Sequence, residues 1–328
     1  MNNHVSDTVN HHQAPVILQQ DQVEALLPLL DVKNELIAMF QSLGQSNAVQ
    51  PPQTLTLLPQ DAGDFITYSG AMAEQEVFGA KLSPYLVTEK APVITAWTSL
   101  MSQRTGQPLL WCDSALLTTE RTAGTTAVAV DYLAKPESRE LAIIGSGAIA
   151  LAHLRHVKNL RQWQRIRVYS PSLAGNEKRK AEFAALDERV EFSPSPQSCV
   201  DGADVVMLCT SSGTPVISND LLSPSVLVTS ISTNVANAHE VSPSLLLHAD
   251  VYCDYSATTP DSAGEMVIAN TELSWHKEAI KGDLPGLLNG TCSLPDFTRP
   301  VFFRSIGLGL EDIAMAYGLW KLLQSRGQ

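Results

Sequence analysis

The sequence predicts an α/β protein in which a doubly wound parallel sheet is joined to a second, mixed α+β domain. Three observations predict it. An apolar run at 141–144 leads straight into glycines and then into a helical stretch. A second strand-like run at 165–169 follows at the spacing of a βαβ unit. From there on, strand-like and helical segments alternate, as they do in a doubly wound sheet.

The N-terminal part predicts a helical entrance and a small sheet. Residues 1 to about 16 are polar and are expected to form a loose arm. A strand-like start at Ile17 gives way to two stretches of helical period, which begin at Asp21 and Asp31. Short strand-like runs separated by turn residues then predict a mixed or antiparallel sheet, and they cover 54–58, 64–69, 77–82, 91–99 and 108–113. A helix over 117–133 leads on to the glycine-bearing strand.

The glycines at 145–150 follow the G-x-G-x-x-G/A pattern of a dinucleotide-binding Rossmann fold. In this pattern the first glycine allows a tight turn, and the second removes a side chain where the pyrophosphate meets the backbone. The helix that follows would point unpaired amide groups at the phosphates. We therefore predict cofactor contacts at Gly145, Ser146, Gly147, Ala148 and Ile149.

The rest of the parallel sheet is predicted from further apolar runs. With the first two strands, the predicted set is 141–144, 167–170, 190–192, 205–210, 226–231 and 251–254. The strand that ends at Thr210 and Ser211 should present these two residues to the cofactor, because ligands bind at the carboxyl ends of parallel strands. Near the C terminus, a glycine turn at 305–309 runs into a helix.

The end of the second nucleotide-domain strand favours NADPH over NADH. An NAD site usually ends this strand with Asp or Glu, which binds the ribose 2′-hydroxyl. Here Ser170 and Ser172 stand in its place, and Lys178 and Arg179 follow. Hydroxyls and cations can bind a 2′-phosphate that a carboxylate would repel. The alternative is that the two basic residues only line a solvated helix face.

Composition excludes several classes of function. The net charge of −12 opposes nucleic-acid binding. No apolar run approaches the roughly 20 residues that cross a bilayer, and the polar start does not resemble a signal peptide, so we expect a cytoplasmic protein without a membrane partner. The five scattered cysteines form no C-x-x-C pair, so neither a disulfide framework nor a metal site is predicted.

With these pieces in place, the chain resembles the ornithine cyclodeaminase/mu-crystallin family over nearly its full length. Four stretches carry the resemblance, at 79–81, 118–122, 144–150 and 303–314. It implies a homodimer and a Rossmann domain, 120–302, inserted into a substrate-binding and dimerisation domain made of 1–119 and 303–328. It also implies cofactor-dependent chemistry on an α-imino or α-amino carboxylate.

The resemblance assigns Lys81 and Arg121 to the substrate carboxylate. Arginine presents a planar fork suited to a carboxylate, and lysine adds a compact charge that can donate a proton if its pKa is depressed. The alternatives are a surface charge for Lys81 and a structural ion pair for Arg121. Glu311 and Asp312, in the C-terminal motif, are placed either near the site or at a helix cap.

Two departures from the family pattern redirect the expected reaction. Gln53 stands where cyclodeaminases carry an arginine, and Asn234 stands where they carry a catalytic aspartate, on an alignment that places Glu240 in the family's E-L-x-P segment. An amide cannot exchange protons as a carboxylate does. Full ornithine cyclisation is therefore disfavoured, and Gln53 and Asn234 are expected to hydrogen-bond the ring nitrogen or carboxylate of a substrate.

The prediction is an NADPH-dependent ketimine reductase that converts Δ1-pyrroline-2-carboxylate to L-proline, and its six-membered homologue to L-pipecolate. The proton comes from Lys81 or from an ordered water, or the imine binds already protonated. The alternatives are another enzyme of the family, such as an ornithine cyclodeaminase or an alanine dehydrogenase, and a non-catalytic NADPH- and ligand-binding protein of the crystallin type.

Overall fold

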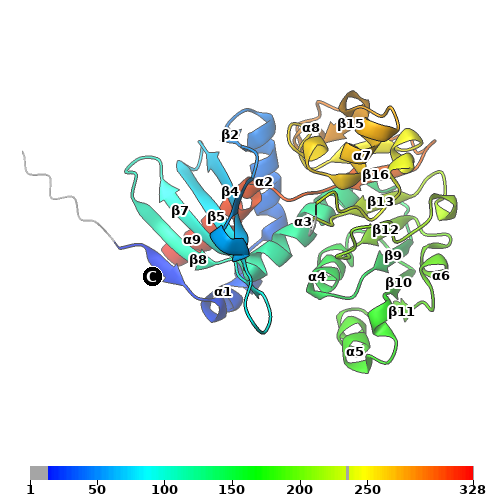
Figure 1. Cartoon of the computed structure of the whole chain (residues 1–328), viewed down its shortest axis with the longest axis horizontal. Coiled ribbons are helices and arrows are strands. Elements are labelled where there is room, and N and C mark those ends of the chain that lie inside the picture. Colours follow the sequence, from blue (N-terminus) through cyan, green and yellow to red (C-terminus); the bar gives the residue numbers. More distant parts are fainter. Residues whose placement is uncertain (1–13, 234–235, 328) are drawn as a thin grey trace, which may run out of the picture.

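The computed structural model describes residues 14–233 and 236–327, which form two sheets that lie side by side with helix α3 (Ala115–Leu133) between them (Figure 1). The predicted N-terminal arm therefore lies outside the described residues as far as residue 13. The first sheet is mixed, as predicted: β1 pairs with β8 in parallel and the other pairs are antiparallel. Its strands are β1 (Val16–Leu18), β2 (Ala48–Val49), β3 (Thr54–Leu57), β4 (Gly63–Met72), β5 (Val77–Leu86), β6 (Val93–Ile94), β7 (Trp97–Ser102) and β8 (Pro108–Asp113).

The strand predicted over 91–99 is in fact two strands, β6 and β7. Both pair with β5, and the break falls at Thr95 and Ala96. In the register of this pair, Thr95 lies opposite Pro84. Proline has no backbone N–H to donate, so the ladder is interrupted at this point. The pattern of residues 91–99 alone could not predict this break, because the proline that causes it lies on the neighbouring strand.

Three helices cover one face of the first sheet: α1 (Gln20–Leu26), α2 (Val32–Gly44) and α9 (Gly309–Ser325). The C-terminal helix α9 lies on β4, β5 and β7 (Figure 1). Its start approaches β4 so closely that a Cβ on Gly309 would lie 2.6 Å from the carbonyl oxygen of Ser69. This close approach explains the glycine in the C-terminal motif and returns the chain end to the first sheet.

The second sheet is entirely parallel, with strand order β11-β10-β9-β12-β13-β16-β14-β15. Two of its strands, β15 and β16, were not predicted, and β16 lies between β13 and β14. Its strands are β9 (Glu140–Ile144), β10 (Arg165–Tyr169), β11 (Val190–Phe192), β12 (Val205–Leu208), β13 (Leu227–Ser230), β14 (Asp250–Cys253), β15 (Ile280–Asp283) and β16 (Val301–Arg304).

The chain reverses its direction of travel across this sheet between β9 and β12. From β9 it runs outward through β10 and β11, then returns to β12 on the other side of β9. A crevice forms at the carboxyl ends of the strands at such a switch point. The connecting helices are α4 (Ala148–Val157), α5 (Glu177–Leu186), α6 (Pro196–Val200), α7 (Gly264–Glu272) and α8 (Leu284–Leu288).

The division into two domains, 1–119 with 303–328 and 120–302, stays a proposal, and the two sheets agree with two domains. The proposed boundary at 119/120 falls inside α3, and the one at 302/303 falls inside β16. We therefore propose that the second junction lies in the turn that begins at Ser305.

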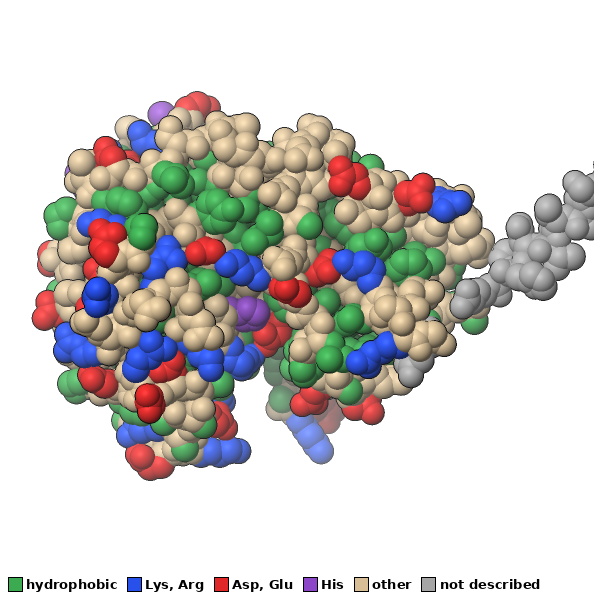
Figure 2. Space-filling model, turned by 180° about the vertical axis from the view of Figure 1, so that it is seen from behind, with side chains coloured by type: hydrophobic (Ala, Val, Ile, Leu, Met, Phe, Trp, Pro, Cys, Tyr) green, Lys and Arg blue, Asp and Glu red, His purple; other side chains and the backbone are tan. Residues whose placement is uncertain are grey.

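In the space-filling view, a notch separates the two halves of the molecule, and basic and acidic side chains are interspersed on that face (Figure 2). None of the helices in the described ranges combines the length and apolarity needed to cross a bilayer.

Candidate active site

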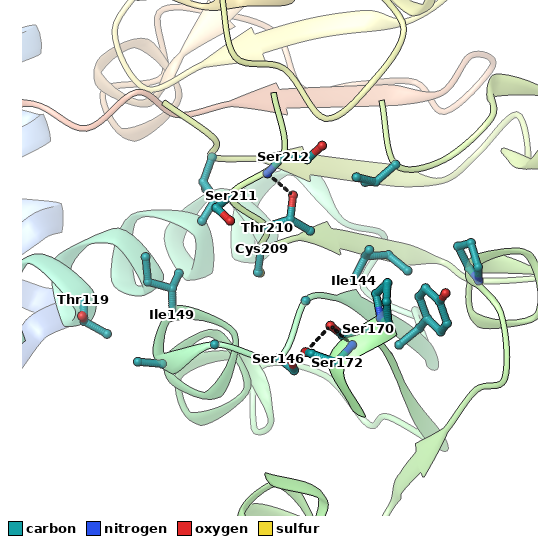
Figure 3. A pocket seen from close by; sticks show the side chains of 18 residues that line it. Thr119, Ile144, Ser146, Ile149, Ser170, Ser172, Cys209, Thr210, Ser211 and Ser212 are labelled. Carbon is teal, nitrogen blue, oxygen red and sulfur yellow. Dashed lines mark hydrogen bonds between the residues drawn. The ribbon is translucent and has the colours of Figure 1, made fainter. Parts of the chain in front are cut away.

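A pocket of about 920 Å³ opens at the carboxyl ends of β9, β10 and β12 (Figure 3). It lies at the switch point of the sheet, where a doubly wound fold binds its ligand. Nine of the ten predicted cofactor residues line it. The full lining is Thr119, Ile144, Gly145, Ser146, Gly147, Ala148, Ile149, Tyr169, Ser170, Pro171, Ser172, Pro196, Cys209, Thr210, Ser211, Ser212, Val216 and Ile231.

The two glycines of the fingerprint differ in what surrounds them. Gly145 has φ +129°, and a Cβ there would lie 2.4 Å from the carbonyl oxygen of Cys209. It is therefore required by the fold. Gly147 caps α4, and a Cβ there would meet no described atom within 4 Å. Because Gly147 lines the pocket, this open space would let a pyrophosphate approach the backbone. The residues that line the pocket therefore suit a dinucleotide.

A chain of hydroxyls ends the second strand of the pocket. Ser172 Oγ lies 2.8 Å from Ser146 Oγ and 2.9 Å from Ser170 Oγ (Figure 3). Ser170 also accepts a hydrogen bond from the Ser172 amide at 3.4 Å. Lys178 lies on exposed α5 and is outside the pocket lining, and Arg179 pairs with Glu182 at 2.7 Å. The hydroxyls, rather than the basic residues, thus surround this end of the pocket.

The opposite wall is held by one buried carboxylate, Glu240. Its Oε1 accepts two hydrogen bonds from Thr210, one from the amide and one from the hydroxyl, both 2.7 Å. Its Oε2 accepts from the Ser230 hydroxyl at 2.8 Å and from the amides of Ile231 and Ser232 at 2.9 and 3.1 Å. Glu240 therefore ties together the loops after β12 and β13. Sequence reasoning used Glu240 only as an alignment mark and missed this role.

Lys81 and Arg121 lie together and are buried, on β5 and α3. Lys81 Nζ lies 2.9 Å from Asp312 Oδ2. Arg121 Nη1 donates to Glu311 Oε2 at 2.9 Å, and Arg121 Nε donates to Asp312 Oδ1 at 3.3 Å. Lys81 is thus no surface charge, and Glu311 and Asp312 are its neighbours in the first turn of α9. The Leu310 amide of this turn donates to Gln50 Oε1 at 2.9 Å. The partners of Arg121 come from α9 and do not include Glu120.

Burial changes the proton affinity of this cluster. It lowers the pKa of Lys81 to about 8, and the negative charge of Asp312 opposes the shift. It raises the pKa of Glu311 to about 7; Arg121 opposes this shift, while Asp254 and Asp312 reinforce it. The Lys81 ammonium also lies 4.3 Å from the centre of the Tyr68 ring. A lysine and a glutamate that both titrate near neutrality are typical of functional sites.

The turn at 305–307 lies in close contact with the Arg121 guanidinium. Gly307 has φ +78°, and a Cβ there would lie 2.2 Å from Arg121 Nη1. Asp254, fully buried at the end of β14, holds this turn. Its Oδ2 accepts from the Ser305 hydroxyl at 3.0 Å and from the amides of Ile306 and Gly307 at 2.7 and 3.0 Å. Asp254 was not singled out from the sequence, because only the fold brings it next to the C-terminal turn.

Two adjacent residues of α3 connect the ion cluster to the nucleotide pocket. Lys81 Nζ donates to Thr118 Oγ1 at 3.4 Å, and Thr119 lines the pocket at its edge (Figure 3). Arg121 follows within the same turn. The pair of Lys81 and Arg121 therefore lies beside the pocket that the dinucleotide would fill.

The other two predicted substrate residues are placed differently. Gln53 is exposed and lines a small cavity of about 40 Å³ together with Tyr68 and Gly307, next to the ion cluster. Asn234 lies outside the described residues. Among the described residues, no group of three or more His, Cys, Asp or Glu side chains could hold a metal ion.

The fold and the site together define a Rossmann-type, dinucleotide-dependent oxidoreductase. The model of the ornithine cyclodeaminase/mu-crystallin family matches residues 13–325, and the chain belongs to this family. It is 52% identical to an NAD(P)H-dependent anabolic L-arginine dehydrogenase from Pseudomonas aeruginosa, over 95% of this chain and 98% of the relative. Named relatives include this NAD(P)H-dependent dehydrogenase and a reductase of an imino acid, which supports an oxidoreductase.

Two further likenesses are more distant. A Δ1-pyrroline-2-carboxylate reductase from Colwellia psychrerythraea is 24% identical over 93% of this chain and 96% of the relative. The solved structure of an archaeal alanine dehydrogenase, a dimer with bound NAD, superimposes with a TM-score of 0.85 at 21% identity and covers 96% of this chain and 97% of that one. The structural likeness confirms the predicted fold.

Proposed function

We propose that this protein reduces the C=N bond of a 2-imino acid with NAD(P)H and forms an L-amino acid. The observation that carries the proposal is the shared helix α3. Thr118 and Arg121 contribute to the ion cluster, and Thr119 lines the dinucleotide pocket. A carboxylate anchored at the cluster would have its neighbouring carbon beside the pocket that the dinucleotide would fill, and catalysis would be mainly positioning.

Each step of the reaction has residues to support it. Lys81 and Arg121 bind the substrate carboxylate, with Gln53 at the adjoining cavity. When bound, NAD(P)H supplies the hydride that adds to the C=N carbon. The nitrogen gains one proton, and Lys81 is its donor, since a lysine with a pKa near 8 both holds and releases a proton at neutral pH. Asn234 stays a proposed hydrogen-bond partner of the substrate.

The substrate that we favour is the imine of 5-guanidino-2-oxopentanoate, whose reduction gives L-arginine. This proposal rests on the 52% identity, over nearly both whole chains, to a relative named as an anabolic L-arginine dehydrogenase. The cyclic ketimine Δ1-pyrroline-2-carboxylate, the substrate predicted from the sequence, is the second candidate. It is supported by a relative of that name at 24% identity.

One assay separates these candidates. We would follow NADPH absorbance with purified protein and 5-guanidino-2-oxopentanoate plus ammonium, and in parallel with Δ1-pyrroline-2-carboxylate. We expect faster oxidation in the first reaction, with L-arginine formed. Faster NADPH oxidation with the cyclic ketimine would instead make Δ1-pyrroline-2-carboxylate the favoured substrate. Ammonia release from L-ornithine with NAD⁺ would instead identify a cyclodeaminase, and inactivity throughout would favour a binding protein.

We also propose that NADPH is preferred over NADH. The support is the hydroxyl chain of Ser146, Ser170 and Ser172, which offers donors to a 2′-phosphate and no carboxylate to repel it. Ser170→Asp should invert the preference, with kcat/KM falling at least tenfold for NADPH and less for NADH. Ser293→Asp, at an exposed position outside the pocket lining, is the control. An unchanged NADPH to NADH ratio in Ser170→Asp would contradict this assignment.

A homodimer through the first sheet is the third proposal. One face of this sheet is covered by α9, whereas large apolar side chains of its strands stay exposed, among them Leu55, Leu57, Tyr85, Val93, Ile94 and Trp111. Clusters of exposed apolar side chains of this kind mark protein interfaces. The archaeal alanine dehydrogenase of the same fold is described as a dimer.

A further inference from the structure

Five ionisable side chains are buried together around the proposed carboxylate site. Lys81, Arg121, Asp254, Glu311 and Asp312 are each at most 6% exposed. Glu311 and Asp312 pair directly with the two cations, and Asp254 joins them through the turn at Gly307. They come from β5, α3, the end of β14 and α9, so no single segment of sequence contains the cluster.

The cluster has more carboxylates than cations. When all five groups are ionised, two positive charges face three negative ones, and the net charge is −1. The uncharged Tyr68 ring lies against Lys81, and the Cys112 thiol, whose pKa burial raises, faces Asp312. An uncompensated charge in such a buried place is costly, and the usual remedy is a change of protonation.

Glu311 is the member best placed to change protonation. Its Oε2 binds Arg121, whereas the buried Oε1 has the Thr125 hydroxyl as a neighbour, and a hydroxyl can accept from a protonated carboxyl as well as donate to a charged one. The carboxylate of Asp254 is satisfied by several donors, and Asp312 touches both cations. A proton on Glu311 Oε1 would therefore cost the cluster no existing contact.

We propose that Glu311 takes up a proton from solvent when the carboxylate of the imino acid binds between Lys81 and Arg121. The inference rests on the proposed function, because it requires the substrate carboxylate in this cluster. That carboxylate brings a fourth negative charge to the two cations. Protonation of Glu311 cancels the addition, so the site keeps the same net charge when the substrate binds.

The sign of the pH dependence follows. Burial raises the pKa of free Glu311 to about 7, and a bound anion raises it further. Below pH 7 the proton is already present and affinity is flat. Above pH 7 each binding event must take up the proton, so affinity falls by up to about tenfold per pH unit. Lys81, with a pKa of about 8, adds a second contribution as the pH approaches 8.

Proton uptake can be measured without turnover. Calorimetric titrations at pH 7.5 in phosphate and in Tris report the number of protons bound, from the different ionisation enthalpies of the buffers. The probes are 5-guanidino-2-oxopentanoate and pyrrole-2-carboxylate, added to the protein–NADP⁺ complex, which has no hydride to give. The variant is Glu311→Gln, an isostere that is always neutral. The matched control is Glu265→Gln, a buried carboxylate paired with Arg304 away from the cluster.

We expect wild type and Glu265→Gln to take up about one proton per ligand at pH 7.5, about three-quarters of it from Glu311 and the rest from Lys81. Uptake should fall to about a tenth at pH 6. In Glu311→Gln more than half of the uptake at pH 7.5 should be lost, and affinity at pH 8 should exceed that of wild type. Equal uptake in Glu311→Gln and wild type, or none in wild type, would overturn the role of Glu311. If Arg121→Lys binds the probes as tightly as wild type, the proposed carboxylate site itself is wrong.

Discussion

Arg121 makes structural contacts within the protein in addition to the substrate contact that we propose for it. It pairs with Glu311 and Asp312 and packs under Gly307. Its removal would leave the buried Glu311 without its cation and Asp312 with Lys81 alone, at a cost of about 3–5 kcal/mol. A truncation to alanine thus mixes loss of substrate binding with loss of stability. The charge-conserving substitution is the better probe.

Arg121→Lys should raise KM for the imino acid at least tenfold and leave KM for NADPH within about twofold, because lysine keeps the charge but loses the planar fork. Steady-state kinetics with each substrate varied in turn provides the measurement. Arg155→Lys, in a partly exposed pair with Glu120, is the control and should change neither value. An equal rise in both KM values would place Arg121 in the cofactor site or the fold.

Gly307→Ala should weaken imino-acid binding by displacing the Arg121 guanidinium, which lies 2.2 Å from the added Cβ. The matched control is Gly290→Ala. Gly290 also has a positive φ, +67°, but its Cβ would meet nothing within 4 Å. Both variants carry the left-handed backbone cost of about 1 kcal/mol, and Gly307→Ala should lose more Tm than Gly290→Ala because the displaced guanidinium also loses its carboxylate partners. Only Gly307→Ala should raise KM for the imino acid, and a rise in both would contradict the contact.

The start of α4 illustrates how one element combines a fold requirement with a binding requirement. Gly145 must be glycine because its backbone is strained and its Cβ would strike the Cys209 carbonyl. Gly147 has an ordinary extended backbone, φ −75°, and open space around it. The fingerprint in the sequence does not distinguish these two reasons.

Gly147→Val should leave Tm within a few degrees of wild type and raise the Kd for NADPH at least tenfold, since the side chain would occupy the space that we assign to the pyrophosphate. Gly145→Ala should instead lower Tm clearly. Differential scanning fluorimetry and titration of NADPH fluorescence measure the two effects. Unchanged NADPH affinity in Gly147→Val would show that the cofactor does not approach this helix end.

At the level of the assembly, the exposed apolar face of the first sheet predicts a dimer interface, and a charged side chain introduced on this face should disrupt the dimer. Ile94 is 69% exposed on this face. Ile94→Asp should convert a dimer to a monomer, as measured by light scattering after size-exclusion chromatography. Leu294, which is 62% exposed in the other half of the molecule, provides the control, and Leu294→Asp should stay dimeric. A wild-type monomer, or a dimer in Ile94→Asp, would contradict this interface.

The sequence by itself determined the fold class of this protein and predicted the residues of the pocket that we assign to the dinucleotide. Both follow from local patterns: apolar strands, a glycine turn and a helix start lie within a few residues of one another, so the chemistry of the segment decides its shape. Nine of the ten predicted cofactor residues accordingly line one pocket. Lys81 and Arg121 were reached only through a resemblance to a family, because nothing in their local pattern distinguishes them.

Only the tertiary structure decided what surrounds these two residues. The partners of Lys81 and Arg121 lie on α9, some 190 positions or more along the chain, and Asp254 reaches them from the end of β14. The insertion of β16 between β13 and β14 brings these segments together. Burial and net charge in a cluster depend on every group that converges there. The proton affinity of Glu311 is therefore a property of the folded molecule and of no single stretch of its sequence.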